Sequence, residues 1–167
     1  GAFVGADERL HLLEAFSGRG EIGPPGFLSG FAVLRQFGQA GQPNPLLQLA
    51  AARGKCLEGM ISALPPLPEI DDPGEAAFMT GIFSLLDTLL HLPLADVLTA
   101  VPLAPSIAAA LARHEGPLGQ LLKVLVDGDA GRHETAADTL KSLGISPELH
   151  LAAQVGAYTW ASRITLE

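Results

Sequence analysis

The fold class of this chain is decided by the start signal Asp72-Pro73-Gly74-Glu75 and the apolar run that follows it, from Ala76 to His91. Asp72 is suited to the N-cap, Pro73 to the first helical turn, and Glu75 to closing a capping box. Apolar residues then recur at helical spacing in two adjacent stripes: Phe78, Ile82, Leu85 and Leu89, beside Met79, Phe83, Leu86 and Leu90. We therefore predict one helix over 73–91, covered by neighbours on most sides and central to the domain.

Outward from this segment, the same combination of proline starts and 3.6-residue periodicity predicts further helices. They cover residues 7–16, 28–37, 45–64, 94–100, 105–113, 117–126, 132–143 and 147–165. No segment alternates with period two while being rich in Val, Ile and Thr, which is the pattern of a strand. The expected fold is all-α, a compact multi-helix bundle with no significant sheet.

The composition limits the partners and the compartment. The 167 residues carry 18 acidic and 10 basic side chains, a net charge of −8, so nucleic acid and anionic membranes are not expected partners. No apolar run reaches the length of a membrane span.

With Cys56 alone, no intrachain disulfide can form, which favours a cytoplasmic location. A buried, inert thiol is expected at this position. A start at Gly1 instead of Met suggests a fragment of a longer protein.

Four blocks in order carry a resemblance to a known family. They are Leu47-Gln-Leu-Ala-Ala-Ala-Arg53-Gly-Lys55-Cys-Leu-Glu58, the helix from Ala77 to Leu90, the turn Arg113-His-Glu115-Gly116-Pro117-Leu-Gly119, and Asp127-Gly-Asp129 with Ala157-Tyr-Thr-Trp160-Ala161. Together they resemble the HDOD family, the HD-related output domain of bacterial signalling proteins. The match is to the branch in which this domain follows an EAL domain, the cyclic-di-GMP phosphodiesterase module.

The resemblance implies an HD-domain-like helical core over 45–167, preceded by an N-terminal helical segment over 1–44 that matches the start of the family domain weakly. It also implies a bacterial regulatory module that works through protein–protein contacts. Its partner would be another protein or its own upstream EAL domain, and a homodimer is a further expectation. Any phosphodiesterase activity would belong to the EAL domain.

Related HD phosphohydrolases bind metals through a His-Asp doublet, which by the resemblance falls on Ser84 and Leu85. Leucine cannot ligate a metal, and the five histidines lie in separate predicted elements: His11, His91, His114, His133 and His150. We therefore expect no enzymatic activity, no metal and no cofactor. The spacing of Asp127 and Asp129 fails the calcium-loop pattern and predicts a polar turn between helices.

Several polar side chains remain candidates for a residual pocket or a structural role. Asp87 and His91 lie four residues apart on one helical face with Ser84, which suits either a proton-transfer pair or an ordinary hydrogen bond. Arg53 lies near the buried stripe of its helix, where we expect an ion pair with Glu58 or Asp87. Trp160 is expected to be a packing anchor or a docking point. The turn Glu115-Gly116-Pro117 carries the family motif.

Three hypotheses about function follow. The first is a non-enzymatic signalling module of HDOD type linked to cyclic di-GMP. The second is a divergent, metal-dependent phosphohydrolase of HD type. The third is a structural helical domain that dimerises.

Overall fold

Prolines begin most of the longer helices of this chain, because proline lacks the N–H that the first helical turn leaves unpaired. The structure is a computed structural model, and it describes residues 45–85, 87–88, 93–100 and 103–164. Its helices are α3 (Pro45–Ile61), α4 (Pro73–Phe83), α6 (Leu94–Ala100), α7 (Pro105–Arg113), α8 (Gly116–Asp129), α9 (His133–Leu143) and α10 (Pro147–Ile164). The predicted helices 7–16 and 28–37 lie outside the described residues.

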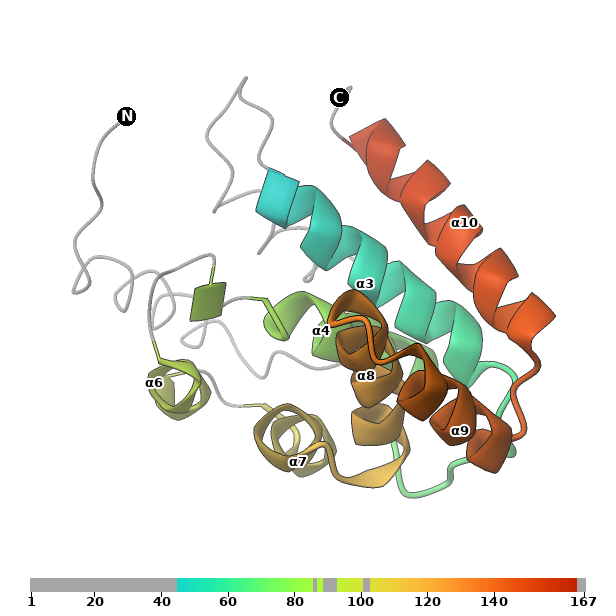
Figure 1. Cartoon of the computed structure of the whole chain (residues 1–167). Helices are drawn as coiled ribbons and strands as arrows, with labels where there is room; N and C mark the ends of the chain where they lie inside the picture. Colours follow the sequence, from blue (N-terminus) through green and yellow to red (C-terminus); the bar gives the residue numbers. More distant parts are fainter. Residues whose placement is uncertain (1–44, 86, 89–92, 101–102, 165–167) are drawn as a thin grey trace.

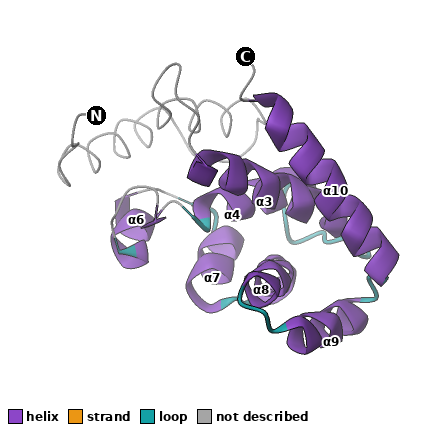
Figure 2. Cartoon of the chain, turned by 45° about the horizontal axis from the view of Figure 1, so that its top comes forward, coloured by secondary structure: helices purple, strands orange, loops and turns teal. Residues whose placement is uncertain are grey.

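The described part of the chain contains helices and no strand, which confirms the all-α prediction (Figure 2). Helix α3 packs most extensively against α4 and α10, and α10 runs antiparallel to α3 (Figure 1). Helix α8 contacts α3, α4, α7 and α9, so it joins the remaining helices to this central group. None of the described helices is both long and apolar enough to cross a membrane.

The core forms where the apolar stripes of α3 and α4 meet. Phe78, Ile82, Met79 and Phe83 on α4 are at most 1% exposed, and both predicted stripes are therefore buried along this helix. The larger cluster adds residues of α3, α7, α8 and α9, including Leu57, Met60, Ile107, Leu121 and Leu140. A smaller cluster combines Phe78 and Ile82 with Ala50, Ala51, Ala52 and Ala161, and Leu85 and Trp160 pack against it.

The prediction of a single helix over 73–91 was wrong, because α4 ends at Phe83. The Leu85 N–H donates to the Ile82 carbonyl, three residues back instead of four, so the chain leaves the α-helix in a tighter turn. At this turn the Ser84 hydroxyl donates to the Gly81 carbonyl at 2.6 Å. A hydroxyl that bonds its own backbone competes with helical hydrogen bonding. Leu85 is half-buried beyond the end of α4, in place of the full burial expected for a central helix.

The start of α4 matches its sequence signal only in part. The Asp72 side chain accepts from the Glu75 N–H at 3.2 Å, as an N-cap does. Glu75 does not complete the capping box, since its side chain is buried and its Oε1 has no hydrogen-bond partner among the described residues. Asp72 has φ 43°, an uncommon conformation for a residue other than glycine.

Candidate functional site

The side chain of Arg53 connects three helices at the position where the family resemblance puts the metal-binding doublet. Arg53 lies on α3 with its side chain 13% exposed, and its Nη2 lies 2.6 Å from Asp129 Oδ2 at the end of α8. Its Nη1 donates to Ser84 Oγ, 3.3 Å away at the end of α4. A guanidinium at two helix C-termini is favourable, because the partial negative charge of each helix gathers at that end.

The expected partners of Arg53 were wrong. Glu58 forms its ion pair with Lys55, at 3.3 Å, and Asp87 accepts from the N–H of its neighbour Thr88 at 2.8 Å. The ion pair itself exists, but its acid comes from α8. Asp129 is 76 positions away from Arg53 in the chain, so no local pattern links the two residues.

The acidic segment at the end of α8 is helical, in contrast to the inter-helix turn that we predicted. Asp127 is buried, with Oδ2 2.6 Å from Lys123 Nζ and Oδ1 2.9 Å from Arg132 Nε. These two hydrogen bonds lower the pKa of the Asp127 carboxyl. The four-residue spacing of Lys123 and Asp127 could have revealed this pair, since such residues are neighbours on a helix surface.

Trp160 packs inward from α10, so its ring contributes to the fold. Its ring meets the ring of Phe78 edge to face, with centroids 5.8 Å apart and planes at 84°. The Lys55 ammonium lies 5.3 Å from the centroid of the Trp160 ring, within cation–π range. Lys55 therefore joins Glu58 and Trp160 along the contact between α3 and α10.

The motif turn Glu115-Gly116-Pro117 is built by backbone geometry. Gly116 has φ 71°, a conformation that glycine adopts without strain. A Cβ at Gly119 would overlap the backbone of His114, so the first turn of α8 packs directly against the chain that enters it. Arg113 and Glu115 form an ion pair at 2.8 Å across this turn, on the surface. The motif thus has a steric function in the structure.

The other predicted polar residues do not gather into a site. His91 lies outside the described residues, so the proposed pair with Asp87 stays a prediction. Burial raises the pKa of the Cys56 thiol to about 12, which leaves it protonated and unreactive at neutral pH. Among the residues that the structure describes, no three His, Cys, Asp or Glu side chains cluster as metal ligands.

A cleft of about 850 Å³ opens between α8, α9 and the start of α10. Its floor is made of aliphatic residues that are already buried, such as Leu125, Leu140 and Ile145. Its rim carries both signs of charge, from Asp138 and Lys141 among others. Burial lowers the pKa of His150 in this cleft, and its Nε2 has no partner among the described residues. An aliphatic floor, a rim with charges of both signs and one imidazole do not together select a single class of ligand.

Chemically, the Arg53 cluster can hold helices together, but it offers no nucleophile with an adjacent base. A guanidinium stays protonated in proteins and cannot accept a proton. The Ser84 hydroxyl is hydrogen-bonded to Arg53 and Gly81, and Asp129 is occupied by Arg53. A positive charge at this position also repels a second cation.

Comparison with known proteins gives a partial similarity. No family model matches the chain, and no solved structure matches it. The chain is 46% identical over 48 residues to the cyclic di-GMP phosphodiesterase CdgJ of Vibrio cholerae serotype O1. Those residues are 29% of this chain and 11% of that relative, so the chain spans a small part of the curated protein it resembles. The HDOD resemblance therefore stays a prediction.

Proposed function

We propose that this chain is a non-enzymatic helical output module, of HDOD type, in a bacterial protein of cyclic-di-GMP signalling. Its context is supported by the partial similarity to a cyclic di-GMP phosphodiesterase. Its role, on this proposal, is to make protein–protein contacts, either with another protein or with a catalytic domain in the same polypeptide. The fold class agrees with a helical output domain.

The observation that carries the non-enzymatic part of the proposal is the guanidinium of Arg53. It lies 3.3 Å from Ser84, the residue that corresponds to the first member of the HD metal-binding doublet by the resemblance. Hydrolysis of a phosphodiester in that superfamily needs a metal that activates water and neutralises phosphoryl charge. A fixed positive charge next to the doublet position is unfavourable for such a metal.

The alternative of a divergent phosphohydrolase has less support. It would need ligands from elsewhere, and the two carboxylates at the end of α8 already form ion pairs. Asp129 is paired with Arg53, and Asp127 accepts from Lys123 and Arg132. If either carboxylate left its ion pair to bind a metal, the positive charge of its basic partner would be uncompensated.

Metal titration of the purified chain tests this proposal. Isothermal calorimetry with manganese and magnesium should give no saturable site, and elemental analysis should give well under one metal per chain. A site of one metal per chain that is lost in Asp129→Asn would contradict the proposal. Asp138→Asn is the matched control, since Asp138 is an exposed acid on α9 with no ion pair among the described residues.

A further inference from the structure

Helix α10 carries an exposed apolar surface. All the large hydrophobic residues that are exposed in the described part of the chain lie on this helix: Leu149, Leu151, Val155 and Tyr158. Leu151, Val155 and Tyr158 are 61%, 58% and 55% exposed, and their spacing of four and three residues sets them along one side. The opposite side of α10, with Ala157 and Ala161, is buried against α3.

Small residues occupy the middle of this exposed surface. Ala152, Gly156 and Thr159 are all exposed, and a Cβ added at Gly156 would meet no atom within 4 Å. Small side chains beside large apolar ones let a second helix approach closely while its own side chains interlock. The centre of α10 therefore has the shape of a helix-packing surface with no helix of the described chain upon it.

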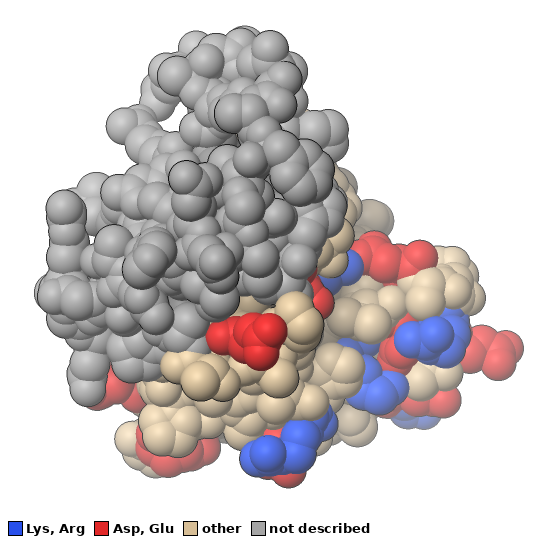
Figure 3. All heavy atoms as spheres, turned by 90° about the vertical axis from the view of Figure 1, so that its left-hand side faces the viewer, with Lys and Arg blue, Asp and Glu red and all other residues tan. Residues whose placement is uncertain are grey.

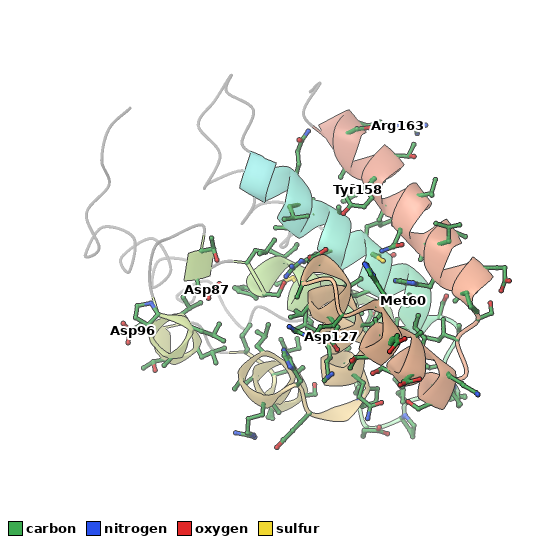
Figure 4. All side chains as sticks on the ribbon, viewed as in Figure 1. Met60, Asp87, Asp96, Asp127, Tyr158 and Arg163 are labelled. Atoms are coloured by element: carbon green, nitrogen blue, oxygen red, sulfur yellow. The ribbon has the colours of Figure 1, made fainter. Side chains whose placement is uncertain are left out.

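The two ends of the surface carry opposite charges. Glu148 lies in the first turn of α10 and Arg163 in the last, and both are exposed. Neither forms an ion pair with another described residue. Figure 4 shows the Arg163 side chain extending away from the other helices. The surface thus runs from an acid, through an apolar centre, to a base.

We infer that this surface of α10 pairs antiparallel with α10 of a second copy of the chain. A two-fold axis that crosses α10 between Val155 and Gly156 fits the pattern. Glu148 lies as many residues before this point in the sequence as Arg163 lies after it. Each Glu148 then faces the partner's Arg163, and the apolar centres meet. A parallel pair would set like charges side by side, which is unfavourable.

The charge on the surface of α10 is compatible with self-association. Two chains that each carry −8 repel one another at long range. On the face drawn in Figure 3, described acids and bases are interspersed and form no field of one sign. The apolar surface of α10 carries one acid, Glu148, and one base, Arg163. Two copies can therefore meet there without an excess of acidic charge.

This inference rests on the proposed function in one respect: it assumes that the module acts through protein–protein contacts. A helix of 18 residues is about 27 Å long, so one helix pair makes a small interface. Small interfaces belong to weak or transient complexes. We therefore expect an equilibrium between monomer and dimer that depends on concentration.

Light scattering and sedimentation equilibrium of the full chain test the pairing. The mass should rise with concentration from 17.3 kDa toward about twice that value. Val155→Glu should return the chain to a monomer and leave the melting temperature unchanged in dilute solution, where the parent is also monomeric, because Val155 is 58% exposed. Gln120→Glu adds the same charge on the exposed side of α8, and it should leave the dimer intact.

The charge pairs test the register. Glu148→Lys and Arg163→Glu should each weaken association several-fold, and the double variant should restore it, because the antiparallel register exchanges the two charges. A monomer at every concentration, or a dimer unaffected by Val155→Glu, would overturn the pairing. Neither result bears on metal binding, so the titration described above separates a failure of this inference from a failure of the proposed function.

Discussion

Gly54 of α3 and Gly81 of α4 face each other where the two helices cross, with no room for a side chain between them. A Cβ at Gly54 would lie 2.7 Å from the Phe78 carbonyl oxygen, and a Cβ at Gly81 would overlap the backbone of Gly54. The obstructing atoms are backbone, which cannot rotate away as a flexible side chain can. The close crossing of α3 and α4 therefore depends on glycine at both positions.

Gly81→Ala should destabilise the fold strongly. Overpacking typically costs about 1–3 kcal/mol, and we expect the upper part of that range because two backbones must separate. The melting temperature should fall by roughly 6–12 °C for a chain of this length. Gly128→Ala is the control, since no atom lies within 4 Å of a Cβ there, and it should be neutral or slightly stabilising. Equal melting temperatures for Gly81→Ala and the parent would contradict the crossing.

Arg53 and Asp129 should be energetically coupled. A double-mutant cycle with Arg53→Met and Asp129→Asn should give a coupling of about 0.5–1 kcal/mol, because Asp129 is half exposed and water screens the pair. The matched cycle with Arg53→Met and Glu58→Gln should give a coupling near zero, since Glu58 pairs with Lys55. Chemical denaturation measures both. A larger coupling energy between Arg53 and Glu58 than between Arg53 and Asp129 would show that Asp129 is not the main partner of Arg53.

Asp127 should stabilise the protein above the pH at which the unfolded carboxyl titrates. Hydrogen bonds from Lys123 and Arg132 lower its folded pKa, so its contribution is complete above about pH 4 and is lost as the pH falls through the folded pKa. Melting curves of the parent and of Asp127→Asn should therefore converge as the pH falls from 6 toward 2.5. A difference that stays constant over this interval would rule out the charged interaction.

Glu75 should show the opposite dependence on pH. Burial raises its pKa, and the carboxylates of Asp72 and Glu58 raise it further, so its charged form is unfavourable in the folded state. Glu75→Gln should consequently raise the melting temperature at pH 7, and the gain should disappear below about pH 4, where the carboxyl is protonated in both states. A variant that melts lower than the parent at pH 7 would show that the Glu75 charge is compensated.

Sequence signals predicted most of the fold because proline and periodic apolar residues act locally. Residues 94–100 and 105–113 are helical over the predicted spans, and α9 and α10 begin or end within one residue of prediction. The end of α4 could not be predicted, because its apolar stripes continue past Ser84 without a glycine or proline. Arg53 from another helix donates to Ser84 at this turn, and a tertiary contact of that kind is not visible in a local sequence pattern.

The candidate site was less predictable than the fold. The burial of Cys56 follows from its helical neighbours, and an ion pair for Arg53 follows from the cost of burying a lone charge. The partner of Arg53 depends on how α8 packs against α3, and no local pattern contains that information. The sequence shows the charges of Glu148 and Arg163. Only the structure shows that both side chains are exposed on one helix with Val155.

A hydrolysis assay tests most directly the proposal that this chain is a non-enzymatic module. The purified chain is incubated with cyclic di-GMP, cyclic di-AMP or a nitrophenyl phosphodiester, each with manganese, magnesium or iron. We predict no turnover above the protein-free control. General-base help from a carboxylate or an imidazole alone supplies about 10²–10⁴-fold, against the 10⁶-fold or more that enzymes typically reach. Turnover that persists through further purification and is abolished by Asp87→Ala or His91→Ala would show that the chain is an enzyme.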